Sequence, residues 1–300
     1  MCLNGGININ NLINVCGKDR VFENEPLKNH TSFRIGGNAK AVIIPETIEE
    51  LLSVIKQLRN EKFVIIGNGS NILAPDEGVD YYVIKTTKIN KVSVRDNEIL
   101  AECGATLSKI ANQAMENSLK GMEFASGIPG TIGGGVVMNA GAYDGELSQI
   151  VVKTTYCNRD GDVFELTNEE HEFAYRHSFF SNKDYIILSS IVRLNYGDKS
   201  EILAKMRELN QRRADKQPLN FPSAGSTFKR PEGYFAARLI DDSGLRGMRV
   251  GGAQVSEKHC GFIINADNAS SEDVKKLMAL CQDKVYEKFG VKIEPEIKIL

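Results

Sequence analysis

The hydrophobic and polar positions of residues 41–66 alternate between strand-like and helical spacing. Residues 41–44 predict a short strand, and Thr47 with Glu50 has the spacing of a capping box at a helix start. The apolar side chains that follow share one helical face: Ile48, Leu51, Leu52, Ile55 and Leu58. A second apolar strand, residues 63–66, runs directly into Gly67. Because α/β folds bind ligands at the carboxyl ends of strands, this order predicts a ligand-binding loop at Gly67.

Strand patterns dominate the middle of the chain. They cover residues 82–85, 91–95, 98–103, 150–158, 163–166 and 185–194. Asp96 and Asn97 predict a turn between the second and third of these strands, and Asp160 with Gly161 predicts one between the fourth and fifth. Residues 107–118 have helical spacing, and Gly121 is the predicted stop of that helix.

The last third of the chain mixes both patterns. It contains helical patterns at residues 201–215, 234–242 and 271–289, a loop at 217–231 and a strand at 261–265. At the end, Val291, Ile293, Ile297 and Ile299 alternate with lysines and glutamates, which predicts a strand with one polar face. The patterns divide the chain into three regions, residues 1–80, 81–198 and 199–300, of mixed strand and helix content.

The composition is typical of a globular protein, since the 300 residues are 42% hydrophobic and 25% charged. The net charge is −2 and the basic residues are dispersed, so nothing indicates a nucleic acid or a membrane surface as partner. Residues 1–20 lack the apolar core of a signal peptide, and we expect a cytosolic protein. The six cysteines include no Cys-x-x-Cys and are accompanied by four histidines, so we expect reduced thiols and no metal site.

Two glycine-rich loops carry the strongest functional signal: Gly67-Asn68-Gly69-Ser70-Asn71 and Gly127-Ile128-Pro129-Gly130-Thr131-Ile132-Gly133-Gly134-Gly135. Glycine lets backbone N–H groups approach phosphate oxygens closely, and Ser70, Asn71 and Thr131 add side-chain donors. Neither loop has a P-loop or Rossmann spelling, because Ile72 stands where a third glycine is needed and no lysine follows in the required place. Each loop alone is also compatible with a structural turn, whereas the pair indicates a ligand that carries a diphosphate.

Three other places have residues suited to chemistry, and each also has a structural interpretation. Arg176 lies among aromatic residues 175–180, which fits either a functional cation or a stacked arginine. Residues 223–231 are rich in small hydroxyl side chains and also fit an ordinary turn. Glu296 is on the polar face of the last predicted strand, where a solvated glutamate is common. His177 and His259 have no partners at metal spacing, and we interpret both as packed or hydrogen-bonded side chains.

Six motifs in this order resemble the UDP-N-acetylenolpyruvoylglucosamine reductases, over residues 30–300. They are Thr31-Ser32-Phe33-Arg34-Ile35-Gly36-Gly37, residues 67–71, residues 127–134, Asn139-Ala140-Gly141-Ala142-Tyr143, Tyr175-Arg176-x-Ser178 and Gly225-Ser226-x-Phe228-Lys229. The resemblance implies an α+β fold in which two subdomains, residues 1–80 and 81–198, form an FAD-binding fold of the vanillyl-alcohol-oxidase type. It also implies a third, α/β substrate-binding domain, residues 199–300, whose last strand returns to the active site.

The resemblance further implies non-covalent FAD, since neither glycine loop carries a histidine or cysteine. The implied cofactor-binding residues are Arg34, Gly67, Asn68, Gly69, Ser70, Asn71, Ile72, Gly127, Ile128, Pro129, Gly130, Thr131, Gly133, Gly134, Asn139, Gly141 and Ala142. NADPH is the implied reductant and UDP-N-acetylglucosamine enolpyruvate the implied substrate. Tyr175, Lys216, Lys229 and Gln254 are the implied substrate-binding residues. The chain is similar to the shorter subtype, which lacks a tyrosine-bearing loop, and we expect a monomer.

In the implied chemistry, the β-carbon of the enolpyruvyl group takes a hydride from flavin N5, and Ser226 gives a proton to the α-carbon. Arg176 stabilises the negative charge that develops, and Glu296 assists at the same carboxylate, where a raised pKa is expected. Two other functions stay open. One is an FAD-dependent sugar or alcohol oxidase on the same scaffold, and the other is a non-catalytic module that binds a nucleotide sugar or flavin.

Overall fold

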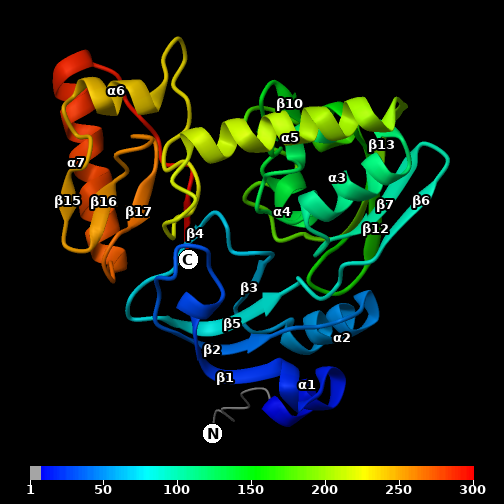
Figure 1. Cartoon of the computed structure of the whole chain (residues 1–300). Coiled ribbons are helices and arrows are strands. Elements are labelled where there is room, and N and C mark those ends of the chain that lie inside the picture. The colour runs from blue at the N-terminus through cyan, green and yellow to red at the C-terminus, as the bar shows by residue number, and fades with distance from the viewer. Residues whose placement is uncertain (1–7) are drawn as a thin grey trace, which may run out of the picture. The chain divides into compact units, whose positions relative to one another are not determined.

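The computed structural model describes residues 8–300, which form two compact units (Figure 1). The first unit contains the described residues up to Asn24, Lys40–Asn68 and Asp80–Asn210. The second unit contains Glu25–Ala39, Gly69–Val79 and Gln211–Leu300. The chain therefore crosses between the units several times. The predicted division into two subdomains, residues 1–80 and 81–198, and a third domain, residues 199–300, stays a prediction.

The amino-terminal sheet has the strand order β1 (Val21–Pro26), β2 (Asn38–Ile43), β5 (Val79–Lys85) and β3 (Phe63–Ile66). Strand β3 pairs in parallel with β5, and Ile66 is aligned with Lys85. Helices α1 (Ile9–Cys16) and α2 (Ile48–Leu58) contact each other, and the core beside them includes Tyr82 and Ile84 of β5. The predicted β-α-β order is confirmed for α2 and β3, whereas α1 was not predicted.

Helix α2 begins as predicted, but its capping box is only half formed. Thr47 accepts a hydrogen bond from the backbone N–H of Glu50. The Glu50 carboxylate does not reach back to Thr47, because it accepts from the N–H of Glu46 at 2.8 Å and binds both terminal nitrogens of Arg20. The predicted reciprocal bond is therefore wrong.

The first unit also holds a five-stranded antiparallel sheet, in the order β12 (Val163–Thr167), β11 (Val151–Cys157), β13 (Ile186–Arg193), β7 (Glu98–Glu102) and β6 (Val92–Arg95). These strands confirm the predicted ones within one or two residues. Helices α3 (Leu107–Glu116) and α4 (Ile132–Val137) contact β7. The predicted stop of α3 at Gly121 is wrong, because Asn117 caps the helix and Ser118 already has a left-handed backbone, with φ 56°.

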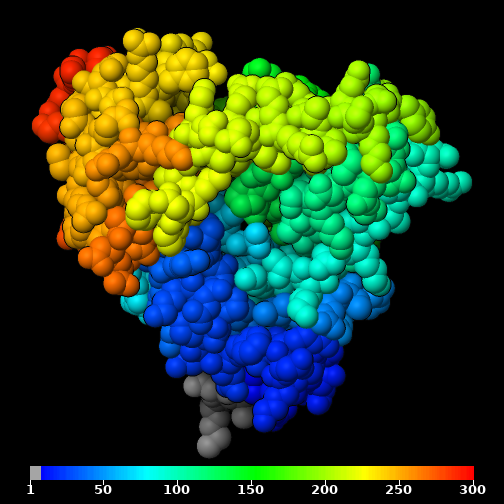
Figure 2. All heavy atoms as spheres, viewed as in Figure 1, coloured from blue at the N-terminus to red at the C-terminus, as the bar shows by residue number. Residues whose placement is uncertain are grey.

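Short paired segments complete the first unit: β8 (Leu119–Lys120) with β14 (Asn195–Tyr196), and β9 (Gly141–Ala142) with β10 (Gly145–Glu146). Helix α5 (Lys199–Lys216) follows and ends in residues of the second unit. It buries only Ile202, Met206 and Leu209, and the rest of its length is visible at the surface in yellow-green (Figure 2).

The second unit packs helices α6 (Ala236–Asp242) and α7 (Ser271–Phe289) with a sheet of β15 (Arg249–Val250), β16 (Ala253–Val255) and β17 (Ile263–Asn265) (Figure 1). The predicted bounds of α7 are confirmed. Its first turn has two caps: Ser270 accepts from the N–H of Asp273, and the Asp76 carboxylate accepts from the N–H groups of Ser271 and Glu272. Residues 69–79 are thereby tied to the carboxy-terminal part of the same unit.

The predicted strand at residues 291–299 is mostly wrong. A regular strand is formed only by β18 (Lys298–Ile299), which pairs in parallel with β4 (Ile72–Leu73). Ile293 and Ile297 are buried as predicted, but Ile299 is 51% exposed. The reason is that Pro295 has no N–H for a ladder, and the segment changes its pairing partner from residues 227–229 to residues 71–73.

The cysteines that the structure describes are free and buried: Cys16, Cys103, Cys157, Cys260 and Cys281. Burial raises the pKa of the Cys103 thiol to about 12. Cys2 lies outside the described residues. Within residues 8–300 no helix is long and apolar enough to cross a membrane, and no cluster of three potential metal ligands occurs.

Candidate functional site

The two glycine-rich loops meet in the first unit. The amide of Asn68 donates to the carbonyl of Pro129 at 2.7 Å. A Cβ added to Gly67 would lie 2.3 Å from Oγ1 of Thr131, far inside van der Waals contact. Glycine is therefore required at position 67 by the neighbouring loop itself. The predicted association of the loops has a physical basis in this contact.

Backbone hydrogen bonds fix the second loop to the start of α3 and the end of β7. The carbonyl of Gly130 accepts from Leu107, and the N–H of Gly133 donates to Cys103. Thr131 caps α4 by accepting from the N–H of Gly134 at 3.4 Å. A Cβ on Gly133 would lie 3.0 Å from the carbonyl oxygen of Cys103, whereas one on Gly134 would meet only Thr131 Oγ1, at 3.7 Å. Gly133 is thus needed for close packing against Cys103, whereas position 134 has room for a side chain.

The joined loops have backbone donors suited to an anion. Among the hydrogen bonds within residues 8–300, none uses the N–H groups of Gly67, Asn68, Gly130 or Thr131. Such donors, in loops where glycine allows close approach, fit a phosphate group. The residues present in the first unit therefore fit the diphosphate of a dinucleotide.

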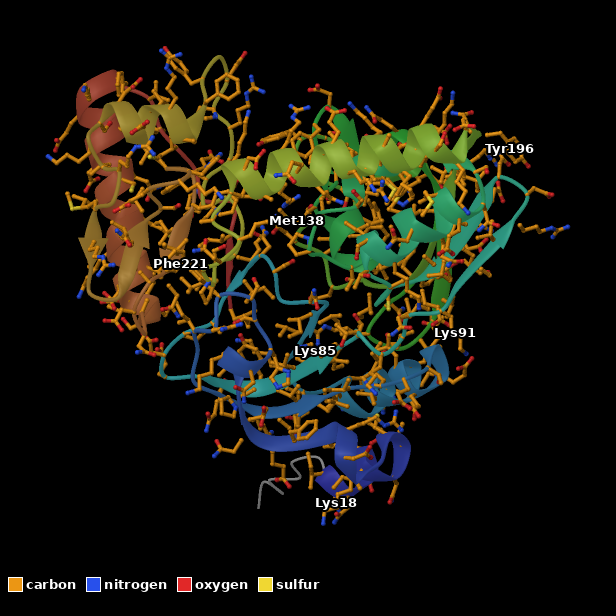
Figure 3. The ribbon with its side chains drawn as sticks, viewed as in Figure 1. Lys18, Lys85, Lys91, Met138, Tyr196 and Phe221 are labelled. Carbon is orange, nitrogen blue, oxygen red and sulfur yellow. The ribbon has the colours of Figure 1, made fainter. Side chains whose placement is uncertain are left out.

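Lys85 is a further candidate that the sequence patterns did not reveal. It ends β5, aligned with Ile66, the residue before Gly67 (Figure 3). Since Ile84 faces the core beside α2, alternation puts Lys85 on the opposite face of the sheet. Burial lowers the pKa of the Lys85 ammonium. The sequence could have indicated Lys85 as a lysine that ends the apolar run Tyr81-Tyr82-Val83-Ile84. Its pairing with Ile66, next to the first glycine loop, is visible only in the structure.

Arg176 is held in a specific orientation. Its backbone is left-handed, with φ 54°, and its guanidinium carbon lies 5.0 Å from the ring centre of Tyr175. Its Nη2 donates to the carbonyl of Gly141 at 3.4 Å. The predicted contact of the arginine with an aromatic ring is confirmed for Tyr175, and the fixed guanidinium is compatible with a functional cation. Tyr175 itself is 50% exposed.

Asn139 supports the same region from within. It is fully buried with φ 43°, its amide donates to the carbonyl of Ala174, and its side-chain oxygen accepts from the N–H of Ser148. Its side chain is therefore engaged by the protein, and its role toward a cofactor stays a prediction. Gly141 has a packing reason as well, because a Cβ there would lie 2.7 Å from the carbonyl oxygen of Gly145.

His171 is a buried histidine that the sequence patterns did not reveal. Its Nδ1 lies 2.5 Å from the carbonyl oxygen of Thr167, and its Nε2 lies 2.8 Å from Oγ1 of Thr154. Because a carbonyl can only accept, Nδ1 carries the proton and Nε2 accepts from Thr154. Burial lowers the pKa of His171. Among the predicted histidines, His177 is exposed, whereas His259 accepts from the N–H of Gly261 as we expected.

Ser226 and Glu296 come together in the second unit through pairing of distant segments. Thr227, the residue after Ser226, donates its N–H to the carbonyl of Gly261, and its own carbonyl accepts from the N–H of Glu296. The N–H of Lys229 donates to Glu294, and the Asn71 amide donates to the carbonyl of Glu296. We call these pairings, which join residues 261–263, 226–229, 294–298 and 71–73, the four-segment ladder.

Other predicted residues surround this ladder. Ser32 donates to the carbonyl of Ser223 at 2.6 Å, and its N–H donates to the carbonyl of Gly69. Arg34 is exposed and has a left-handed backbone, with φ 56°. Among the described residues, the N–H groups of Gly69 and Ser70 have no hydrogen bond. Ile72 belongs to β4.

The predicted substrate-binding residues of the second unit have separate environments. Lys216 is exposed at the end of α5. Lys229 pairs with Glu294 at 3.2 Å. Gln254 donates to the carbonyl of Gly247 and accepts from Arg249, which fixes the orientation of its amide.

Comparison with known proteins first defines the class. A family described as an FAD binding domain matches residues 39–167, so the chain is of the FAD-binding class. A family described as the C-terminal domain of UDP-N-acetylenolpyruvoylglucosamine reductase matches residues 217–300. UDP-N-acetylenolpyruvoylglucosamine reductase of Clostridium tetani is 47% identical over 97% of this chain and 96% of its own length. The enzyme of Alkaliphilus oremlandii is 51% identical over 96% of both.

Solved structures agree with this result. The crystal structure of UDP-N-acetylenolpyruvylglucosamine reductase (MurB) from Thermus caldophilus has a TM-score of 0.79 and 33% identity, and covers 92% of this chain and 97% of its own. A Phl p 4 variant described as a glucose oxidase has a TM-score of 0.50 and 11% identity, covering 95% of this chain and 63% of its own, which indicates a similar fold only. The chain belongs to the UDP-N-acetylenolpyruvoylglucosamine reductase family. The predicted family and the α+β FAD-binding fold of the vanillyl-alcohol-oxidase type are confirmed.

Proposed function

We propose that this chain is an FAD-dependent reductase that uses NADPH to convert UDP-N-acetylglucosamine enolpyruvate to UDP-N-acetylmuramate, in peptidoglycan precursor synthesis. The observation that carries the proposal is the near full-length identity of 47% and 51% to enzymes named as reductases of this substrate. The four-segment ladder supports it, because the ladder joins the segments of two predicted catalytic residues, Ser226 and Glu296.

The residues that would hold FAD are those of the two glycine loops. The N–H groups of Gly67, Asn68, Gly130 and Thr131 would bind phosphate oxygens, and Lys85 would add a positive charge. The remaining predicted cofactor residues, including Arg34, Ser70, Asn139 and Ala142, are part of this proposal. Asn71 is the exception, because its side-chain amide donates to the carbonyl of Glu296. When bound, FAD takes reducing equivalents from NADPH and supplies a hydride to the β-carbon of the enolpyruvyl group.

Three side chains would complete the chemistry. Addition of a hydride to the β-carbon moves negative charge onto the α-carbon and its carboxylate, and the permanent charge of Arg176 would stabilise that charge. The hydroxyl of Ser226 would give its proton to the α-carbon. Glu296, whose N–H donates to the carbonyl of Thr227, would bind at the substrate carboxylate. A favourable contact between the two carboxyl groups requires that the side chain of Glu296 carries a proton.

The diphosphate of the substrate needs cations and donors. Lys216 and Lys229 would supply charge, since Lys216 is exposed and Lys229 pairs with Glu294, a surface carboxylate that solvent screens. Gln254 and Tyr175 would add hydrogen bonds. The functional division into residues 1–80 and 81–198 for FAD and residues 199–300 for substrate is part of the proposal, as are a cytoplasmic location, a monomeric state and the absence of a nucleic-acid or membrane partner.

An anaerobic titration tests the function. NADPH should bleach the yellow protein, and UDP-N-acetylglucosamine enolpyruvate should restore the colour. Rapid reoxidation by air without the enolpyruvyl sugar would identify an oxidase instead, and a flavin that NADPH does not bleach would identify a binding module.

The Ser226→Ala variant tests the proton donor. It should retain bleaching by NADPH but lose turnover by about 10²- to 10⁴-fold, the contribution of a positioned general acid. Ser93→Ala, which changes an exposed serine of β6, is the matched control and should leave turnover unchanged. Normal turnover in Ser226→Ala would remove Ser226 from the mechanism.

A further inference from the structure

Asn71 is the last residue of the first glycine loop, and its hydrogen bonds lead to Glu296. Its side-chain amide donates to the carbonyl oxygen of Glu296 at 3.2 Å. Its own carbonyl accepts from the N–H of Lys298 at 2.9 Å. Asn71 therefore contacts the main chain on both sides of Ile297, a residue that is buried. The sequence patterns had assigned this side chain to the cofactor.

The main chain of Glu296 is held from two directions. Its N–H donates to the carbonyl of Thr227 at 2.8 Å, and its carbonyl accepts from Asn71. Thr227 is itself fixed, because it is 2% exposed and its Oγ1 accepts from the N–H of Ile263 at 3.0 Å. The Asn71 amide therefore constrains the carbonyl of Glu296 on the side of its main chain opposite the bond to Thr227.

The neighbouring asparagine of the loop has a different target. Asn68 donates to Pro129 in the second glycine loop, at 2.7 Å. Two asparagines three positions apart thus bind two different parts of the predicted machinery. The hydrogen bond of Asn68 joins the two glycine loops, and that of Asn71 holds the segment of Glu296, a predicted catalytic residue.

We propose that Asn71 is a positioning residue that holds the Glu296 segment, and that it acts on the reduction of the enolpyruvyl group rather than on the retention of FAD. This inference rests on the function proposed above. Loss of a single hydrogen bond would let the Glu296 peptide group rotate and misplace its side chain, while the glycine loop keeps its contact between Gly67 and Thr131.

The test compares Asn71→Ala, Asn71→Asp and Asn68→Ala by anaerobic stopped-flow absorbance of the holoenzyme. Asn71→Ala should slow reoxidation of the flavin by the enolpyruvyl sugar about 3- to 10-fold, the worth of one hydrogen bond. Reduction by NADPH should stay at the wild-type rate. FAD release, followed by the rise of flavin fluorescence after dilution, should also be unchanged. Asn68→Ala should show the opposite pattern, with faster FAD release.

Asn71→Asp separates hydrogen bonding from packing. Aspartate keeps the shape of asparagine but presents only acceptors to the carbonyl of Glu296, so it should slow reoxidation at least as much as alanine does. An Asp variant with wild-type reoxidation beside a slow Ala variant would indicate packing and overturn the inference. Faster FAD release with normal reoxidation in Asn71→Ala would overturn it too. Failure of the wild-type protein to bleach with NADPH would instead refute the proposed function, and the inference with it.

Discussion

The contact between Gly67 and Thr131 makes a quantitative prediction about the junction of the glycine loops. In Gly67→Ala the new Cβ would lie 2.3 Å from Oγ1, 3.2 Å from Cγ2 and 3.3 Å from Cβ of Thr131. Thr131 is 1% exposed and its hydroxyl caps α4, so the side chain has no space into which to rotate. The backbone of Gly67 is not left-handed, so the expected cost is steric. Overpacking of a buried site of this kind costs about 1–3 kcal/mol.

A double-mutant cycle isolates that steric cost. Thr131→Ala alone should destabilise the protein by about 1 kcal/mol through loss of the helix cap. In the double variant the clashing Oγ1 and Cγ2 are gone, and the remaining distance of 3.3 Å between the two Cβ atoms is tight but tolerable. The double variant should therefore lose only about 1 kcal/mol, which is less than the sum of the single losses by about 2 kcal/mol. Gly134→Ala is the matched control, since its Cβ would approach Thr131 Oγ1 only to 3.7 Å and alanine favours the helix.

The assay is urea unfolding followed by far-ultraviolet circular dichroism at one fixed FAD concentration, because ligand binding adds to apparent stability. The same samples give the FAD dissociation constant by fluorescence, which should rise in Gly67→Ala and recover partly in the double variant. Additive single losses would refute the reasoning, because they would mean that the two loops do not touch at this point. A Gly134→Ala variant as unstable as Gly67→Ala would refute it as well.

Two further predictions concern titratable side chains. Lys85→Met should raise the FAD dissociation constant about tenfold, because a phosphate would lose a charge-assisted bond, and salt should weaken the wild type more than the variant. The control is Lys88→Met, which alters a 57% exposed lysine paired with Glu46 and should bind FAD as tightly as the wild type does. If Lys85→Met binds FAD as tightly as Lys88→Met, Lys85 is excluded from the site. Burial lowers the pKa of His171, so on acidification the unfolded chain takes up that proton first, at its ordinary pKa of about 6.5. Stability should be fully present above that pH and fall as the pH drops toward 5, and thermal melting of His171→Gln should depend less on pH across this window, while an unaltered dependence would contradict this assignment.

The sequence predicted elements well where periodicity was strong, and failed where tertiary contacts decided. Helix α7 and strand β3 have the predicted bounds because their apolar positions follow one period. Helix α4 was not predicted, because its sequence Ile-Gly-Gly-Gly-Val-Val consists of poor helix formers. It forms nonetheless because Thr131 caps it and its glycines pack closely, with Gly135 against Leu147. Helix α1 left a signal that was missed, since Ile9, Leu12, Ile13 and Cys16 share one face in an asparagine-rich segment.

The candidate site shows the same division. The sequence motif indicated that Gly67 is glycine because a ligand approaches it. The structure shows a second reason within the protein, because a Cβ at position 67 would clash with the side chain of Thr131. The pairing of residues 226–229 with residues 294–296 could not be predicted, because the segments are far apart in sequence and Pro295 interrupts the alternation that a strand would show. Long-range pairing depends on the whole fold, and a local pattern contains no information about it.

The long-range pairing joins the segments that contain Ser226 and Glu296. Each lies in a segment of irregular backbone, where a side chain on its own would have little fixed orientation. Thr227 removes that freedom from both, because it follows Ser226 directly and its carbonyl binds the N–H of Glu296. A shift of either segment must therefore move the other or break a hydrogen bond of a residue that is only 2% exposed, which is costly. The main chains of Thr227 and Glu296 are consequently held together, and the hydrogen bond from Asn71 extends this connection to the last residue of the first glycine loop.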